Sequence, residues 1–375
     1  MNLYLTQKEG ELYFYTLNDF GHIFDFYPEE MLVESTEGSF YMGIVKDMKN
    51  ALSSAFVEIG EENVGFLPYS EMTEEVHCGQ HILVQSVRNS KDKKGSKLTM
   101  KYSFEGVYCV LLCKEQGVFY SNKMKKTLKE EIKAFLADKE LPYGYIIRSS
   151  VDDTEKLWKE MQRLSEQANT FLGKAQYQMA PKLLLKNSRY DFLKNVKELE
   201  EIYTNDKEIF EDLVAYLKEQ QLAYSAHFRE EDYYIRHDIV RAIEDGLSRK
   251  VWLSSGAYLI IEKTEAMNVI DVNTGKSKGS KDNEKTNLKI NLEAAKEIAR
   301  QLRFRNLSGI ILVDFINLKK EENKEILTKA LTELTAKDTI PTQVHGLTKL
   351  GIMEITRKKK YETLEEWRER EGKER

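Results

Sequence analysis

The sequence predicts an α+β protein built from several domains. Its 375 residues suffice for two or three compact units, and a content of 41% hydrophobic and 10% aromatic residues is ordinary for globular proteins. Short strand-like segments separated by Gly, Asn and charged turns fill residues 38–101. Residues 269–315 instead combine two apolar runs with a long amphipathic segment between them. The chain therefore contains an all-β region and an α/β region.

The predicted elements follow one another along the chain. Residues 1–34 begin with the alternating segment MNLYLTQKEGELYFYTLND, which is typical of a strand and hairpin. Four short strands follow and suggest a small barrel: Phe40–Val45, Ala55–Gly60, Val64–Pro68 and Ile82–Val87. Further on we expect a strand at 145–150, helices at 157–171 and 196–220, a helix from 235, extended chain at 249–253 and a strand at 258–261.

Each of the two apolar runs in the α/β region ends at a carboxylate. The first run continues through Asp271 and Asn273 in the segment VIDVNTGK, and the second ends at Asp314 in ILVDF. Two strands that present an Asp at the same sheet edge can share one hard cation such as Mg²⁺, with the Asn273 carboxamide in support. An Asp after a buried strand is also common as a turn former or helix cap.

The segment between the two runs predicts a helix over residues 285–305. One face of this helix is apolar at three- and four-residue spacing, and comprises Leu292, Ala295, Ile298, Ala299 and Leu302. A strand, a basic loop, an amphipathic helix and a second strand form a βαβ-like unit, in which the strand ends converge on one cleft.

The charge is locally concentrated rather than uniform. The net charge is −5, so contacts with phosphates must come from local basic clusters. Such clusters occur within residues 91–101, 123–129, 276–289 and 357–360. A single charge run is usually a solvated surface, but four in an acidic protein favour an anionic partner.

The cysteines indicate a reducing compartment, and the hydropathy indicates the absence of a membrane span. Cys78, Cys109 and Cys113 lack paired spacing, and no apolar run approaches the length of a membrane span. The N-terminus has no basic start followed by a cleavage site. We therefore expect a cytoplasmic protein without a membrane span.

Four ordered segments together resemble the catalytic core of the ribonuclease E/G family. They are Thr264–Met267 leading into VIDVNTGK, the helix 286–305, GIILVDFINL at 309–318, and Leu350–Arg357. The resemblance is strongest from about 243 to 360, clear at 38–101 and faint at 152–220. Within the clear region, the order AFVEIG, GFLP, GQHILVQ is similar to the OB-fold named after ribosomal protein S1.

The resemblance implies a domain organisation. It implies a ribonuclease-H-like subdomain split over 1–34 and 195–248, into which an S1-type OB-fold at 35–110 and a 5′-monophosphate sensor at 111–194 are inserted. A DNase-I-like α/β catalytic subdomain at 249–375 would follow. Periodicity alone does not give this topology.

The resemblance also implies an activity. It implies a Mg²⁺-dependent endoribonuclease, with Mn²⁺ as an alternative metal, that hydrolyses single-stranded RNA in ribosomal RNA processing or messenger decay. The products would carry 3′-hydroxyl and 5′-phosphate ends, and substrates with a 5′ monophosphate would be preferred. Asp271 and Asp314 would hold the metal, and Asn273 would orient Asp271 or the attacking water.

Substrate contacts are implied in two further places. Phe56 and Phe66 would stack bases, with Lys94 or Lys97 as the rim contact, although both rings could instead fill the barrel. Arg148 and Ser149 would hold the terminal phosphate of the RNA. Four more basic residues are candidate phosphate contacts, with a structural role equally open: Lys276, Arg303, Arg305 and Arg357.

The chain also departs from the family pattern. It has no CxxC, so we expect no structural zinc and, if a homodimer forms, no zinc link within it. Asn306 and Asn317 stand where acidic residues are frequent in relatives, which would weaken metal affinity. A second hypothesis is therefore a non-catalytic RNA-binding protein that uses its OB-fold. The joint presence of Asp271, Asn273 and Asp314 favours the enzyme, because carboxylates facing a polyanion are repelled unless a metal intervenes.

Overall fold

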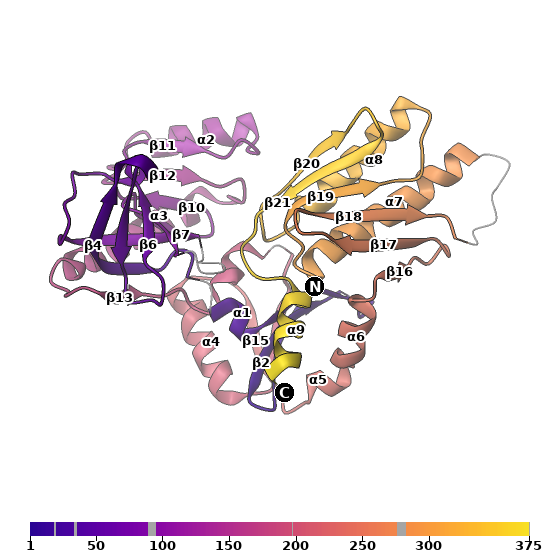
Figure 1. The fold of residues 1–375 in the computed structure, drawn as a ribbon, viewed down its shortest axis with the longest axis horizontal. Coiled ribbons are helices and arrows are strands. Elements are labelled where there is room, and N and C mark those ends of the chain that lie inside the picture. The colour runs from indigo at the N-terminus through magenta and orange to yellow at the C-terminus, as the bar shows by residue number, and fades with distance from the viewer. Residues whose placement is uncertain (19, 34–35, 89–94, 197, 276–282, 375) are drawn as a thin grey trace. The chain divides into compact units, whose positions relative to one another are not determined.

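The computed structural model divides the chain into two compact units (Figure 1). It describes residues 1–375 except 19, 34–35, 89–94, 197, 276–282 and 375. Unit 1 comprises Met1–Glu34 and Asn195–Arg375, and unit 2 comprises Ser35–Lys194. Unit 2 is thus inserted in the sequence of unit 1. Sheets and helices are mixed in both units, as expected for an α+β protein.

Unit 2 contains a closed five-stranded barrel, consistent with an OB-fold. Its strands are β4 (Phe40–Lys49), β5 (Ser54–Glu58), β6 (Gly65–Pro68), β7 (His81–Arg88) and β8 (Lys97–Thr99). They pair in the order β4-β5-β6-β8-β7, and β7 pairs back onto β4 to close the ring, while β13 (Lys182–Leu185) adds to β4. The four predicted strands of this region are confirmed, because alternate residues such as Ala55, Val57 and Leu67 fill the interior.

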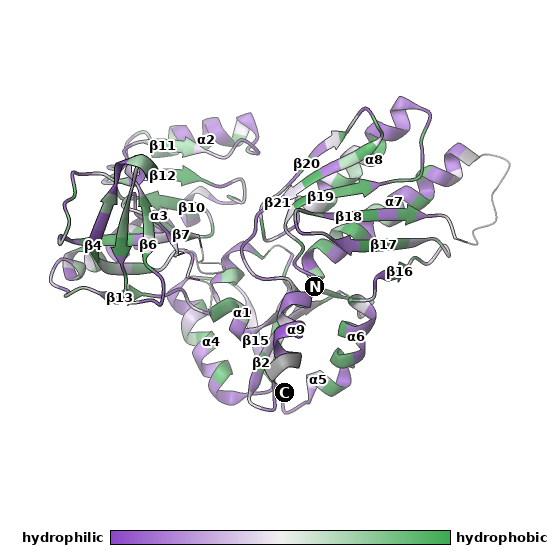
Figure 2. Ribbon diagram, viewed as in Figure 1, coloured by the Kyte–Doolittle hydropathy of each residue, from purple (hydrophilic) through white to green (hydrophobic). Residues whose placement is uncertain are grey.

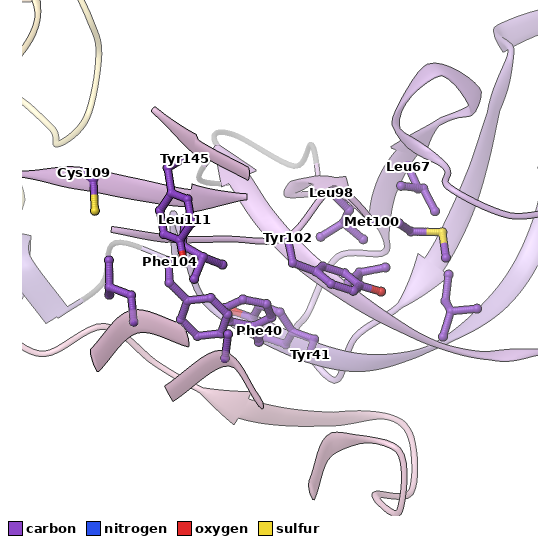
Figure 3. Close-up of a cluster of buried hydrophobic side chains, with 14 of the residues drawn as sticks. Phe40, Tyr41, Leu67, Leu98, Met100, Tyr102, Phe104, Cys109, Leu111 and Tyr145 are labelled. Atoms are coloured by element: carbon purple, nitrogen blue, oxygen red, sulfur yellow. The ribbon is translucent and has the colours of Figure 1, made fainter. Parts of the chain in front are cut away.

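A second sheet in unit 2 shares its core with the barrel. Its strand order is β11 (Val118–Tyr120), β12 (Gly144–Ile147), β10 (Cys109–Leu112) and β9 (Ser103–Glu105). Helices α2 (Lys126–Leu136) and α3 (Thr154–Ala175) belong to the same unit. Figure 3 shows Phe40 and Tyr102 beside Phe104, Leu111 and Tyr145 in one continuous cluster. The buried Glu160 of α3 accepts hydrogen bonds from three successive backbone N–H groups, those of residues 107–109.

The first sheet of unit 1 joins the N-terminal strands to residues that follow the insertion. Its order is β15 (Ser225–Phe228), β14 (Glu201–Thr204), β1 (Asn2–Lys8), β2 (Glu11–Leu17) and β3 (Ile23–Pro28). The shorter helices of this unit are α1 (Glu29–Val33), α4 (Lys207–Glu219), α5 (Tyr233–Arg236), α6 (Ile239–Gly246) and α9 (Leu364–Glu374). The predicted helix at 196–220 is wrong in its first half, where Ile202 and Thr204 alternate into the core as part of a strand.

The second sheet of unit 1 carries the carboxylate motifs. Its order is β16 (Lys250–Trp252), β17 (Tyr258–Lys263), β18 (Met267–Asn273), β19 (Gly309–Asp314), β21 (Ile352–Arg357) and β20 (Thr342–Leu347). β18 and β19 run parallel, and the other neighbours are antiparallel.

Two helices, α7 (Asn283–Phe304) and α8 (Glu321–Thr335), cover one face of this sheet, hereafter the helix face. Buried residues of the strands, such as Ile270, Val313 and Met353, form one core with Ala295 and Ile298 of α7. Hydrophilic and hydrophobic bands alternate along α7 (Figure 2), as the predicted amphipathic helix requires. The strand residues between the buried ones form the opposite face, hereafter the open face. None of the helices that the structure describes is long and apolar enough to cross a membrane.

Candidate active site

The two strand-end carboxylates lie side by side on the open face. β18 and β19 pair in parallel register with Asp271 opposite Asp314. Their flanking residues Ile270, Val272 and Val313 are buried on the helix face, so strand alternation turns both carboxylates to the open face, where both are exposed. Because neighbouring strands are about 4.8 Å apart, the two side chains leave the sheet within reach of one ion.

Asn273 is positioned to orient the first carboxylate. Its Nδ2 atom donates a hydrogen bond to Oδ2 of Asp271 at 2.6 Å, and both residues share one strand face. The chain turns sharply after this point at Gly275, which has a φ of +59°. A Cβ atom there would lie 2.2 Å from the Gly256 carbonyl oxygen, so only glycine permits this close approach.

The loop that follows Asp314 is anchored by polar residues of α7. The fully buried Asn291 donates from Nδ2 to the Ile316 carbonyl at 2.7 Å and accepts from the Ile316 N–H at 3.1 Å. One turn earlier, Asn287 donates to the Asn317 carbonyl at 3.1 Å. The chain that leaves Asp314 is thereby held against the helix. Sequence reasoning missed these anchors, although polar residues spaced three and four apart on an amphipathic helix are a readable signal.

A third anchor lies at the first turn of α7. The Glu284 carboxylate accepts hydrogen bonds from the Asn323 side chain and from the backbone N–H groups of Lys319 and Lys320. These bonds, with that of Asn323 foremost, lower the pKa of Glu284 to about 2. The ionised carboxylate therefore ties the start of α7 to the start of α8.

Two of the predicted phosphate contacts are instead buried ion-pair residues. Arg303 binds both carboxylate oxygens of Asp25 on β3, which is also hydrogen-bonded to the Thr16 hydroxyl. Burial alone would raise the pKa of Asp25, but the charge and hydrogen bonds of Arg303 hold it below its usual value. Arg357 is 2% exposed and binds both oxygens of Asp338. Both guanidinium groups are buried and paired with a carboxylate, so neither is presented at the surface to a phosphate.

Arg305 has the structural role that the sequence left open beside a phosphate contact. It is 1% exposed and donates to Gln301, Glu365 and the Ser248 carbonyl. The following Asn306 has a φ of +52° at the end of α7 and accepts a hydrogen bond from Arg357 at 2.7 Å. Arg357 pairs with Gly309, at the opposite end of β19 from Asp314, so an acidic residue at position 306 would lie away from the carboxylate pair. Asn317 is exposed in the loop after Asp314.

The barrel aromatics lie on the outer surface of the barrel. Phe56 and Phe66 are cross-strand partners whose ring centroids are 6.0 Å apart, and both are only half-buried. The alternative that both rings fill the barrel is therefore wrong. The exposed Lys97 is the parallel partner of Phe66, and the ammonium of Lys49 lies 5.1 Å from the Phe56 ring centroid. Lys94 and Lys276 lie outside the described residues.

The candidate phosphate sensor follows β12. Arg148 is partly exposed and forms an ion pair with Glu105 at 3.3 Å, and its backbone N–H donates to the Tyr108 carbonyl. Ser149 is exposed in the turn that follows, and Ser150 donates to the Val107 carbonyl. An ion pair with a largely exposed carboxylate can be exchanged for one with a phosphate.

The donor set at the carboxylate pair fits a hard cation. Across the described ranges, no group of three or more His, Cys, Asp and Glu side chains is arranged to hold a metal ion. Mg²⁺ accepts one or two carboxylates and keeps several waters, so Asp271 and Asp314 are a sufficient set of ligands. The three cysteines are free thiols, of which Cys109 is buried.

Comparison with known proteins identifies the family. The model of the ribonuclease E/G family matches residues 103–360. The chain belongs to the ribonuclease E/G family. Ribonuclease G of Haemophilus influenzae is 30% identical over 369 residues, covering 88% of this chain and 73% of the relative. Ribonuclease G of Escherichia coli strain K12 is 28% identical and covers 88% and 74%. Ribonuclease E of a Synechocystis strain is 31% identical, with 88% of this chain and 53% of that relative covered.

Membership of the ribonuclease E/G family confirms the resemblance read from the four sequence segments. The matched region includes β12, the following Arg148 and the whole second sheet of unit 1. It also includes Asp271, Asn273 and Asp314, which the structure brings together.

Proposed function

We propose that this ribonuclease E/G family protein is an endoribonuclease that hydrolyses single-stranded RNA with Mg²⁺. The observation that carries the proposal is the parallel register of Asp271 and Asp314 on an exposed sheet face, with Asn273 bonded to the first carboxylate. A site that must approach a polyanion has no use for paired carboxylates unless a cation lies between them. The names of the relatives, ribonuclease G and ribonuclease E, support the same reaction class.

Each side chain of the site has a proposed role. Asp271 and Asp314 would hold the ion through their free oxygens, and Asn273 fixes the rotamer of Asp271. When bound, Mg²⁺ supplies a Lewis acid that neutralises charge developing on the phosphate and acidifies a water, and Mn²⁺ would serve as an alternative. The products would be a 3′-hydroxyl and a 5′-phosphate end.

RNA capture is proposed to use unit 2. The pair Phe56 and Phe66 presents ring faces and edges at the barrel surface, with Lys97 beside them. Such platforms stack bases of any sequence while nearby cations follow the backbone, which suits single-stranded RNA. Arg148 and Ser149 would hold a 5′ monophosphate once Glu105 is displaced, which would give preference for monophosphorylated ends.

The alternative function is RNA binding without cleavage. The outward barrel aromatics would serve either function, so they do not discriminate between the two. The carboxylate pair does discriminate, because it would only repel RNA in a non-catalytic binder.

The decisive experiment measures cleavage of a 5′-monophosphorylated single-stranded RNA, with Mg²⁺ or EDTA. The variants are Asp271→Asn and Asp314→Asn, and the matched control is Glu333→Gln, an exposed carboxylate on α8. We expect cleavage by the wild type and the control with Mg²⁺ only, and RNA binding without cleavage by both Asp variants. Equal cleavage by the Asp variants, or none by the wild type at any Mg²⁺ concentration, would overturn the proposal. No cleavage by the wild type together with intact RNA binding would favour the non-catalytic RNA-binding protein.

A further inference from the structure

We propose that Trp252 and Tyr258, bridged by Lys250, form a base-stacking subsite on the open face beside the carboxylate pair. This inference rests on the proposed RNA cleavage and names where a nucleotide near the scissile phosphate is held. The occupant would be one unpaired nucleobase of the substrate RNA, with its phosphate close to the Lys250 ammonium.

Strand register places this cluster on the same face as the carboxylates. Val251 on β16 and Leu259 and Ile261 on β17 are buried on the helix face, so the residues between them alternate to the open face. Trp252 is the Cα partner of Tyr258, and Tyr258 is the Cα partner of Asn273.

The cluster is close enough to serve the same RNA strand. With neighbouring strands about 4.8 Å apart, Trp252 lies roughly 10 Å across the sheet from Asn273, with Tyr258 between them. Asp271 is two residues along β18 from Asn273, and both point to the open face. A base stacked on Trp252 would therefore belong to a nucleotide close to a phosphate bound at the carboxylates.

The rings and the cation are arranged as a recognition surface. The ring centroids of Trp252 and Tyr258 are 5.2 Å apart at an interplanar angle of 60°, so one ring stands against the edge of the other. The Lys250 ammonium lies 3.9 Å from the Trp252 centroid and 3.8 Å from the Tyr258 centroid. Cation–π attraction holds Lys250 in place without neutralising it, so its positive charge remains available to an RNA phosphate.

The exposure of Trp252 distinguishes it from the other tryptophans. Its side chain is 61% exposed, whereas Trp367 is 8% exposed in the core of unit 1 and Trp158 is partly buried in unit 2. Single exposed hydrophobic residues are normal on protein surfaces. Trp252 differs because a second ring and a cation accompany it on the face that carries the carboxylates.

The binding test uses the Asp271→Asn variant, which the proposed function expects to be inactive, and a single-stranded RNA of about a dozen nucleotides. We expect RNA to quench tryptophan fluorescence in this variant, and the quenching to be lost when Trp252→Phe is added. We expect Trp252→Ala to weaken RNA binding by about 5- to 150-fold, the range of one lost base stack, and Trp252→Phe to restore most of the affinity. The matched control is Phe20→Ala, since Phe20 is an 85% exposed aromatic residue of the same unit.

A cleavage test locates the stacked nucleotide. RNAs that carry one abasic position on either side of the cleaved bond are compared between the active wild-type protein and Trp252→Ala. We expect one abasic position to raise the KM of the wild type and to have no further effect in the variant. Lys250→Met should lower the salt dependence of KM and leave this abasic pattern in place.

The outcomes separate this inference from the proposed function. Loss of all cleavage by the wild type would refute the proposed function, and the fluorescence measurement would still report on the stack. Unchanged affinity in Trp252→Ala, equal effects of Phe20→Ala, or the same abasic pattern with and without Trp252 would overturn the inference while leaving cleavage intact. Because Trp252 is exposed, thermal unfolding of Trp252→Ala should match that of the wild type, which excludes misfolding as the cause.

Discussion

Removal of the Arg303 side chain should lower the stability of unit 1 without acting directly on RNA binding. Arg303→Ala deletes two charge-assisted hydrogen bonds and leaves Asp25, which is 3% exposed, with the Thr16 hydroxyl as its hydrogen-bond partner. A buried carboxylate that loses its ionic partner typically costs about 3–5 kcal/mol of folding free energy. For a unit of this size, about 2–4 °C per kcal/mol gives a fall in Tm of roughly 6–20 °C.

The assay is thermal unfolding of the full chain followed by circular dichroism, in parallel with RNA affinity at several salt concentrations. Arg241→Ala is the matched control, because the Arg241 side chain on α6 is 76% exposed and its removal should change the folding free energy by no more than about 0.5 kcal/mol. The double variant Asp25→Leu, Arg303→Met should recover much of the loss, since an apolar pair leaves no unpaired buried charge. An unchanged Tm in Arg303→Ala, together with a shallower salt dependence of RNA binding, would refute the structural role and restore the phosphate contact.

Three further predictions concern the other parts of the molecule. Phe66→Ala should weaken single-stranded RNA binding by about 1–3 kcal/mol in fluorescence anisotropy at unchanged Tm, and a loss of Tm instead would show that the ring is part of the core. Arg148→Ala should reduce the preference for 5′-monophosphate over 5′-hydroxyl RNA by roughly tenfold or more in competition cleavage, because at least one charge-assisted hydrogen bond is lost; an unchanged preference would exclude the sensor. Glu284→Gln should lower Tm most above pH 4.5, and the deficit should shrink as the pH falls from 4.5 towards about 2, because the depressed pKa makes the ionised anchor stabilising only where the carboxylate is charged. An equal loss of Tm at pH 7 and pH 2 would contradict a stabilising role of the ionised Glu284 carboxylate.

The strand-end carboxylates could be predicted from sequence because strand alternation is a local property. When an apolar run ends at Asp, the strand register then determines on which face and at which edge of the sheet the Asp side chain lies. The same local rule left the direction of Phe56 and Phe66 open, since a shift of one residue reverses every side chain. The structure decides it, with Ala55 and Val57 inside the barrel and the rings outside.

The three arginines could not be assigned from sequence because their partners are distant in the chain. Asp25 is 278 residues from Arg303, and Asp338 is 19 residues from Arg357. A basic residue near a metal motif therefore reads as a phosphate contact until a buried carboxylate is found beside it. Similarly, the strand at 201–204 forms because Ile202 pairs with Leu3 near the N-terminus, which no local pattern around residue 202 reveals.

Helix α7 links the stability of unit 1 to the geometry of the proposed catalytic site. Its apolar face forms the core under the second sheet, and Asn291 holds the loop that follows Asp314. Near its other end, Arg300 donates to the Ile23 carbonyl and Arg303 binds Asp25, both on β3 of the first sheet. We therefore expect a disturbance of either sheet to shift the helix that holds the loop after Asp314. Substitutions along α7 should lower Tm and cleavage together, whereas substitutions on the open face, such as Trp252→Ala, should change RNA binding and cleavage without lowering Tm.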